Sequence, residues 1–176
     1  GNGAVLDSGD PAPSFRLDVP LRGGGTPPLG PNPPVGLRVG LEREPVDRAD
    51  PRQRDWLKAL VWPDHVERFR RLEAALTATS GLSADIREGD ALDLLPAALA
   101  QCPCTGTLAV FHTMAVYQFA EEERRALDDS LTLAGLGRPV WRLPLEWQDG
   151  DYPRMLCRYA DGSRRKGTLA LCDSQG

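Results

Sequence analysis

The chain has 176 residues, 41% hydrophobic and 26% charged, which fits a single globular domain and excludes a chain that is disordered throughout. Its formal net charge of −4 gives no overall attraction to polyphosphate, which argues against nucleic acid and anionic membranes as partners, although local basic patches occur at 68–71 and 164–166. No apolar run approaches the ~18 residues of a membrane span and no secretory signal opens the chain, so we expect a cytoplasmic protein.

Residues 1–36 are rich in glycine and proline and are predicted to form an extended arm with at most a short hairpin around residues 14–19. Proline removes backbone donors, and glycine is entropically costly to order. The triple glycine at 23–25 lacks the flanking strand and helix of a phosphate-binding loop. Because the chain starts Gly-Asn-Gly and stops just after a strand-like run, we expect it to be a fragment of a longer protein.

Residues 37–176 are predicted to form the folded domain, in which strand and helix signals alternate. Trp56 and Trp62 are expected to pack the first helix against its neighbour. The alternation predicts an α/β fold with a mainly parallel sheet flanked by helices and an antiparallel hairpin at its edge. The expected elements are a strand over 35–41, helices beginning at 50–51 and at 64, a strand over 82–88, a helix over 96–101, a strand over 105–112 covered on both faces, a helix over 121–134, a strand over 140–145, and a hairpin of 152–159 with 167–172.

Polar residues follow three of the predicted strands: Glu42 after the first, Asp90 after the second, and His112-Thr113 after the third. If these strands are parallel, the three positions meet at the sheet edge where open α/β folds bind ligands. A carboxylate there can accept both hydroxyls of a ribose, and a neighbouring carboxylate can accept an adenine amino group. The alternative is that Glu42 pairs with an arginine and Asp90 only caps the next helix.

His112 has an ordinary imidazole pKa of ~6.5 and could act as a general base at a strand end. The sequence names no nucleophile for it to activate, so a histidine hydrogen-bonded to a loop carbonyl is the alternative. The other histidine, His65, is expected to face solvent.

Four cysteines, at positions 102, 104, 157 and 172, are expected to be reduced, because a cytoplasmic chain of this size needs no disulfides. Cys102-Pro103-Cys104 is shorter than the usual zinc-ligand spacing and would need a second pair. We therefore expect no metal site, and a zinc-stabilised domain is the weakest of our hypotheses.

Four segments carry a resemblance to a bacterial family of unknown function, which in turn is similar in fold to the class I S-adenosylmethionine-dependent methyltransferases. The resemblance covers most of the chain from about residue 14, and the run Ala-Leu-Val-Trp-Pro-Asp is its most specific part. The segments are GLEREPVD at 40–47, WLKALVWPD at 56–64, GDALDLLP at 89–96 and VFHT at 110–113.

The resemblance implies a methyltransferase-like, Rossmann-like fold and a role for each matching residue. Glu42 would hold the ribose of S-adenosylmethionine, Asp90 and Ala91 would line the adenine pocket, and His112 and Thr113 would face the methyl group and its acceptor. Two departures matter: residues 1–36 contain no glycine-rich loop to hold the methionine part of the cofactor, and an additional helix lies between Glu42 and Asp90.

The sequence therefore supports two functional hypotheses. In the first, the domain is truncated at its N-terminus, its full-length parent binds S-adenosylmethionine and transfers a methyl group to an unknown acceptor, and this fragment binds the cofactor weakly or not at all. In the second, the domain is a non-catalytic interaction module that docks a partner through the Pro/Gly arm or the Trp-containing helix. The sequence indicates neither the acceptor nor the oligomeric state.

Overall fold

A computed structural model of the chain describes residue 16 and residues 34–103, 105–146 and 152–172. The predicted hairpin around residues 14–19 lies outside the described part. None of the described helices is long and apolar enough to cross a membrane. The elements are β1 (Val39–Glu42), α1 (Pro51–Ala59), α2 (Val66–Ala78), β2 (Asp85–Glu88), α3 (Ala91–Gln101), β3 (Leu108–Thr113), the 3-10 helix η1 (Val116–Gln118), α4 (Glu121–Ala134), β4 (Val140–Leu145), β5 (Tyr152–Ala160) and β6 (Ser163–Cys172).

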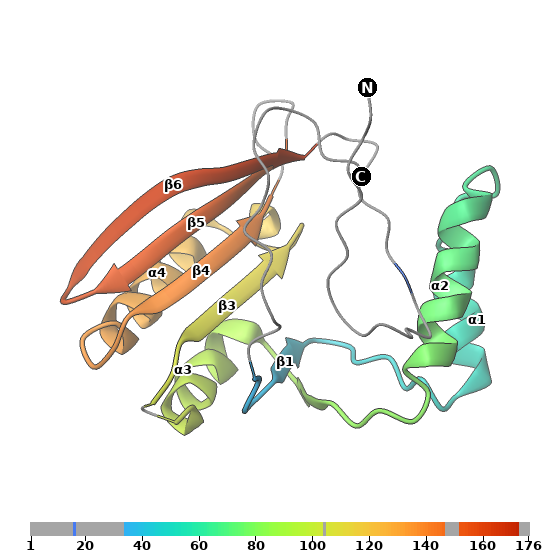
Figure 1. Ribbon diagram of the computed structural model, residues 1–176, viewed down its shortest axis with the longest axis horizontal. Helices are drawn as coiled ribbons and strands as arrows, with labels where there is room; N and C mark the ends of the chain where they lie inside the picture. The colour runs from blue at the N-terminus through green and yellow to red at the C-terminus, as the bar shows by residue number, and fades with distance from the viewer. Residues whose placement is uncertain (1–15, 17–33, 104, 147–151, 173–176) are drawn as a thin grey trace. The chain divides into compact units, whose positions relative to one another are not determined.

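The chain divides into two compact units, one of Gly1–Gly40 with Glu44–Ile86, the other of Leu41–Arg43 with Arg87–Gly176. Among the described elements, the first unit holds α1 and α2, and we call it the helical unit. The second holds α3, α4 and the strands β3 to β6, and we call it the sheet unit (Figure 1).

The strands form two sheets. β1 and β2 make a two-stranded sheet, and the other four strands make a sheet in the order β3-β4-β5-β6. Within the larger sheet β3 and β4 are parallel, while β5 is antiparallel to both β4 and β6. The α/β prediction and the antiparallel hairpin are confirmed, but the described strands form a small parallel sheet and a separate four-stranded mixed sheet rather than one mainly parallel sheet.

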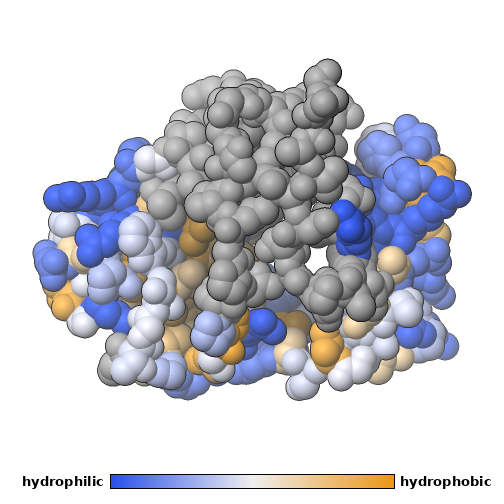
Figure 2. All heavy atoms as spheres, viewed as in Figure 1, coloured by the Kyte–Doolittle hydropathy of each residue, from blue (hydrophilic) through white to orange (hydrophobic). Residues whose placement is uncertain are grey.

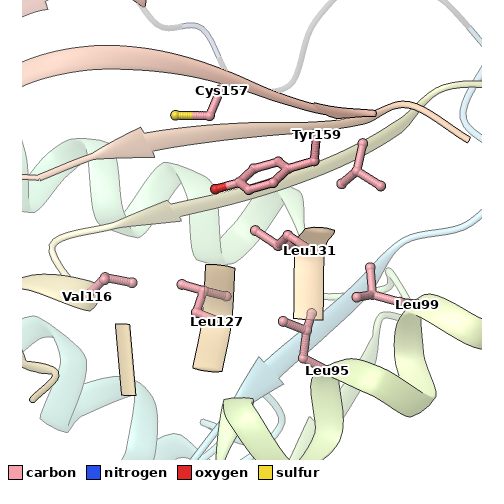
Figure 3. Close-up of a cluster of buried hydrophobic side chains, with 8 residues drawn as sticks. Leu95, Leu99, Val116, Leu127, Leu131, Cys157 and Tyr159 are labelled. Atoms are coloured by element: carbon pink, nitrogen blue, oxygen red, sulfur yellow. The ribbon is translucent and has the colours of Figure 1, made fainter. Parts of the chain in front are cut away.

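The core of the sheet unit lies between α3, α4 and one face of the four-stranded sheet. Val140 and Tyr159 are register partners on β4 and β5, and both are fully buried with Leu131 of α4. Figure 3 shows Leu95 and Leu99 of α3 directed toward the same cluster as Leu127 and Leu131 of α4. Both helices therefore bury their apolar stripes on the same cluster.

β3 is covered on one face only, which corrects the prediction of a strand buried on both faces. Its exposure alternates along Leu108–Thr113, and Phe111 is 78% exposed. The physical reason is that the buried cluster contacts Leu108 and Val110, which share one face of the strand. The unbroken apolar run indicated burial, but the run itself does not supply a second covering layer.

The helical unit has no buried residue in either α1 or α2. Trp56 and Trp62 are 64% and 71% exposed, so the prediction that they pack this helix against its neighbour is wrong. Figure 2 shows this part of the surface as mostly hydrophilic with separate hydrophobic patches.

The helices α2 and α3 begin at residues other than the predicted ones, for local reasons, whereas the start of α1 was predicted correctly. α1 begins as expected, with Asp50 accepting a hydrogen bond from the Arg52 N–H and Pro51 in its first turn. α2 begins at Val66, after His65, which makes no side-chain cap, so the predicted capping box from Asp64 does not form. α3 begins at Ala91 rather than near Pro96, because Asp90 caps it and the proline is accommodated inside the helix.

Candidate functional site

Two carboxylate residues lie at the carboxyl ends of β1 and β2. Glu42 is the last residue of β1, and Gly89 and Asp90 form the turn between β2 and α3. The Gly89 N–H donates to the Glu42 carbonyl oxygen at 3.0 Å, which joins the two strand ends. Gly89 has φ +145°, a backbone conformation that side chains with a Cβ rarely adopt, so this sharp turn requires glycine.

Asp90 both caps a helix and forms an ion pair. Its Oδ1 accepts the Leu92 N–H at 2.9 Å, and its Oδ2 accepts from the Arg43 guanidinium at 2.6 Å. The hydrogen bond from Arg43, together with that from the backbone N–H of Leu92, lowers the pKa of Asp90. In return, the Asp90 carboxylate raises the pKa of Arg43. The two side chains are 31% and 74% exposed, so solvent screens much of their attraction.

Glu42 is exposed and only partly engaged. Its Oε1 accepts the Arg43 N–H at 2.9 Å, and its Oε2 has no hydrogen-bond partner among the described residues. Ala91 is the first residue of α3 and is half-buried beside Asp90. Within the described ranges no ion pair joins Glu42 to an arginine, and the neighbouring Arg43 pairs with Asp90.

A second polar cluster surrounds His112 on β3. The Arg142 Nε–H donates to His112 Nε2 at 2.9 Å, and His112 Nδ1 lies 2.5 Å from Glu146 Oε1. Because Nε2 accepts from arginine, the ring proton belongs on Nδ1, where it is donated to the carboxylate. Burial lowers the pKa of His112, the Arg142 charge adds to this, and Glu146 opposes it.

The Glu146 carboxylate also accepts hydrogen bonds from three backbone amides. Its Oε1 accepts from the N–H groups of Ala115 and Val116, both at 3.2 Å, and its Oε2 accepts from Tyr117 at 3.1 Å. These amides open η1 and would otherwise lack partners within the helix. One carboxylate directly after β4 thus binds the segment that follows β3.

The cluster extends through Arg142 to α4, β5 and β6. Its Nη1 donates to Asp128 of α4 at 2.8 Å, and the Tyr159 hydroxyl donates to the same Oδ1 at 2.8 Å. Arg164 of β6 pairs with the other oxygen of Asp128. Burial is the main cause that raises the pKa of Tyr159, and the Asp128 charge raises the pKa of Arg164.

Residues 2–176 match the family described as "Uncharacterized protein conserved in bacteria (DUF2332)". The chain belongs to the DUF2332 family. No curated protein and no solved structure matches it. The prediction of a bacterial family of unknown function is therefore confirmed, whereas the methyltransferase resemblance remains a prediction.

The structure brings some of the predicted site residues of this DUF2332 chain together. Glu42, Asp90 and Ala91 form one cluster, and His112 lies in the other with exposed Thr113 beside it. Among the described residues, no hydrogen bond or ion pair connects His112 to Glu42 or Asp90.

Sequence reasoning did not identify Glu146 or Arg142 in the DUF2332 chain. Glu146 directly follows β4, so the rule that selected the ends of the first three strands could have found it at the fourth. Arg142 lies inside an apolar strand, and an isolated charge there indicates a buried partner.

The cysteines give no support to a metal site in the described part of the DUF2332 chain. Cys102 and Cys157 are free thiols, and the described residues include no cluster of three metal-ligating side chains. Cys104 and the Cys172 side chain lie outside the description, so the zinc hypothesis stays untested. His65 is exposed, as expected.

Proposed function

We propose that a protein containing this DUF2332 domain binds S-adenosylmethionine and transfers its methyl group to an acceptor at the edge formed by His112 and Thr113. The observation that carries the proposal is the pair of carboxylates at adjacent strand ends, Glu42 and Asp90, joined by the hydrogen bond from Gly89 to Glu42. Ligands of open α/β folds bind outside the carboxyl ends of strands.

The two carboxylates suit the nucleoside half of the cofactor. The Glu42 Oε2, which has no partner in the described part of the chain, could accept a ribose hydroxyl. Asp90 has further lone pairs for an adenine amino group, and its ion pair with exposed Arg43 is screened by solvent, so it can rearrange when a ligand binds. No described residue suits the methionine half, so we assign only nucleoside binding to these residues.

The acceptor edge would act by orientation. S-adenosylmethionine supplies an electrophilic methyl group, and transfer to a nucleophile needs mainly proximity and in-line geometry. With Arg142 and Glu146 bound, the His112 ring has no free lone pair. Its proposed role is therefore to hold the acceptor edge in place, while the exposed Thr113 hydroxyl contacts the acceptor.

Calorimetric titration tests the proposal. S-adenosylmethionine and S-adenosylhomocysteine are titrated into this chain and into a chain extended upstream to include a glycine-rich loop. We expect binding by the extended chain and weak or no binding by this one. In the extended chain, Glu42→Ala and Asp90→Ala should each weaken binding about tenfold or more, by removing charge-assisted hydrogen bonds.

Glu44→Ala is the matched control, since Glu44 is an exposed carboxylate two residues beyond Glu42. It should leave the affinity unchanged. An affinity that neither Glu42→Ala nor Asp90→Ala alters would refute the residue assignments, and no binding by the extended chain would refute the proposal itself.

The exposed tryptophans of the helical unit favour a second candidate, a non-catalytic interaction module. Trp56 and Trp62 are 64% and 71% exposed, and tryptophan is enriched in protein interfaces. A ligand that binds only the folded state raises the melting temperature. A rise with S-adenosylmethionine in the extended chain supports the first proposal, and no rise favours the interaction module.

A further inference from the structure

We propose that Glu146 is the positioning residue of the acceptor edge, holding His112 and the segment after β3 in a single arrangement. This inference rests on the proposed function for its meaning, because an acceptor edge is part of that proposal. The contacts that carry it are four hydrogen bonds to one carboxylate: one from His112 and one each from the amides of Ala115, Val116 and Tyr117.

The backbone at this point needs such support. Met114 lies between the edge residue Thr113 and the three amides, and its φ is +52°, in the left-handed region that is unfavourable for a residue with a Cβ. A strained residue persists only where its surroundings determine it. The Met114 N–H donates to the Leu145 carbonyl oxygen at 2.8 Å, and the next residue along β4's end, Glu146, binds the amides that follow. The carboxyl ends of β3 and β4 are therefore tied to each other.

The charges around the imidazole make the arrangement specific. His112 and Glu146 are 14% and 18% exposed and Arg142 is 12% exposed. Arg142 donates to one ring nitrogen and Glu146 accepts from the other, so the ring is held as the neutral Nδ1–H tautomer. The other tautomer, Nε2–H, would place a donor against arginine and a lone pair against the carboxylate, and a flip of the ring would put C–H groups where the two nitrogens lie. Hydrogen bonding thus fixes ring orientation as well as tautomer.

Arg142 is in turn held from the other side of the cluster. Asp128 accepts from both Arg142 and Tyr159, and Arg164 pairs with the same carboxylate. In the described part of the chain, one carboxylate and one guanidinium hydrogen-bond the ring, and the guanidinium is held in turn by Asp128 of α4. A rigid scaffold of this kind is what a site that acts by orientation requires.

Nuclear magnetic resonance of the imidazole nitrogens tests the inference directly, because the chain has two histidines and His65 lies in the helical unit. In the unmodified protein we expect His112 as the Nδ1–H tautomer, protonating only below the ordinary pKa of about 6.5. An Nε2–H tautomer would overturn the inference without any variant being made.

The variants Glu146→Ala and Glu146→Gln separate positioning from general stability. In Glu146→Ala, Arg142 still donates to Nε2 and should keep the Nδ1–H tautomer, but the imidazole should protonate at lower pH, because Glu146 raises its pKa. Amide exchange at Ala115, Val116 and Tyr117 should rise about tenfold or more, while exchange at Leu131 in the core stays unchanged. Glu146→Gln retains one carbonyl oxygen acceptor and should restore part of the protection. Unchanged exchange at these three amides in Glu146→Ala would overturn the proposal.

Glu121→Gln is the matched control, because Glu121 is an exposed carboxylate of α4 that pairs with Arg125 at 3.3 Å, away from the contacts of His112 and Glu146. It should alter neither the tautomer nor the exchange. Titration of S-adenosylmethionine into the extended chain is run beside these measurements. If the titration shows no binding while the tautomer and exchange results are as expected, the proposed function is wrong and the role of Glu146 in ordering this edge stands. If the titration shows binding while the tautomer and exchange results fail, only the role proposed for Glu146 is refuted.

Discussion

The described helices of the two units are all amphipathic but reach different degrees of burial. In the sheet unit, α3 and α4 bury leucines such as Leu95 and Leu131 against a sheet face. In the helical unit, α1 and α2 bury no residue at all. An apolar stripe therefore predicts which side of a helix can be covered, but the covering layer has to come from another element.

The charged residues differ in the same way. In the helical unit Arg70 and Glu67 form an exposed ion pair, with side chains 69% and 78% exposed. In the sheet unit Arg142 is 12% exposed and its contacts continue into Asp128 and His112. Pairs of the first kind contribute about 0–1 kcal/mol, whereas removing one partner from a desolvated network leaves another charge unpaired and costs more.

The largest expected effect is that of Leu131→Ala. Leu131 is fully buried in the cluster shared by α4 and the sheet, so the substitution removes apolar contacts and leaves a cavity. We expect a loss of about 2–5 kcal/mol in the free energy of unfolding, measured by urea denaturation. Leu133→Ala, on the same helix and 70% exposed, should change stability by less than about 0.5 kcal/mol. Equal effects would contradict the assigned core.

Gly135→Ala should have the next largest effect. A Cβ at this position would lie 2.9 Å from the backbone carbon and oxygen of Tyr159, closer than such atoms approach. Because Gly135 has an ordinary helical φ of −69°, the penalty is steric rather than conformational. We expect about 1–3 kcal/mol of destabilisation by urea denaturation.

Gly137→Ala provides the comparison, since nothing lies within 4 Å of a Cβ at that position. Its free energy of unfolding should stay the same or rise slightly, because alanine restricts the unfolded chain. A cost for Gly135→Ala no larger than for Gly137→Ala would show that α4 and β5 are not packed as closely as described.

Local signals in the sequence predicted individual helices and strands better than they predicted the contacts between these elements. Glu121 to Glu123 marked the start of α4, and the strand over Val140–Leu145 was predicted with its observed bounds. The caps by Asp50 and Asp90 also formed, because a cap depends only on the next two residues. Register and sheet order involve distant residues, and no short pattern encodes them.

For the candidate site, too, the sequence predicted the positions of residues but not the contacts between their side chains. The strand-end rule selected Glu42, Asp90 and His112, whose positions follow from where strands stop. It could not show that Arg43 pairs with Asp90, 47 positions along the chain, or that Glu146 and Arg142 occupy both nitrogens of His112. Those contacts depend on side chains that only the folded chain brings together.

Acidification should weaken the sheet unit through His112. Burial lowers the pKa of this imidazole in the folded state, whereas the unfolded chain has the ordinary value of about 6.5. As pH falls below about 6.5, the unfolded state therefore binds a proton more readily, and the free energy of unfolding decreases. Denaturation in urea at pH values between about 7 and 5 should show this slope, with a smaller slope in His112→Gln. A folded state that is more stable at pH 5 than at pH 7 would contradict the assignment.

The smallest expected change in stability comes from Trp56→Ala, and comparing it with a tryptophan of the sheet unit tests the difference in burial between the two units. Trp56 is 64% exposed on α1, so Trp56→Ala should cost less than about 0.5 kcal/mol, although tryptophan removed from a core costs about 3–5 kcal/mol. Trp141→Ala is the matched substitution in the sheet unit, where the ring is half-buried and the Arg158 guanidinium lies 5.7 Å from its centroid. It should cost distinctly more. If Trp56→Ala proves as costly as Trp141→Ala, the Trp56 ring is covered in solution. The interaction surface considered for the helical unit would then be occupied within the protein itself, leaving the carboxylate pair at Glu42 and Asp90 as the better candidate for function.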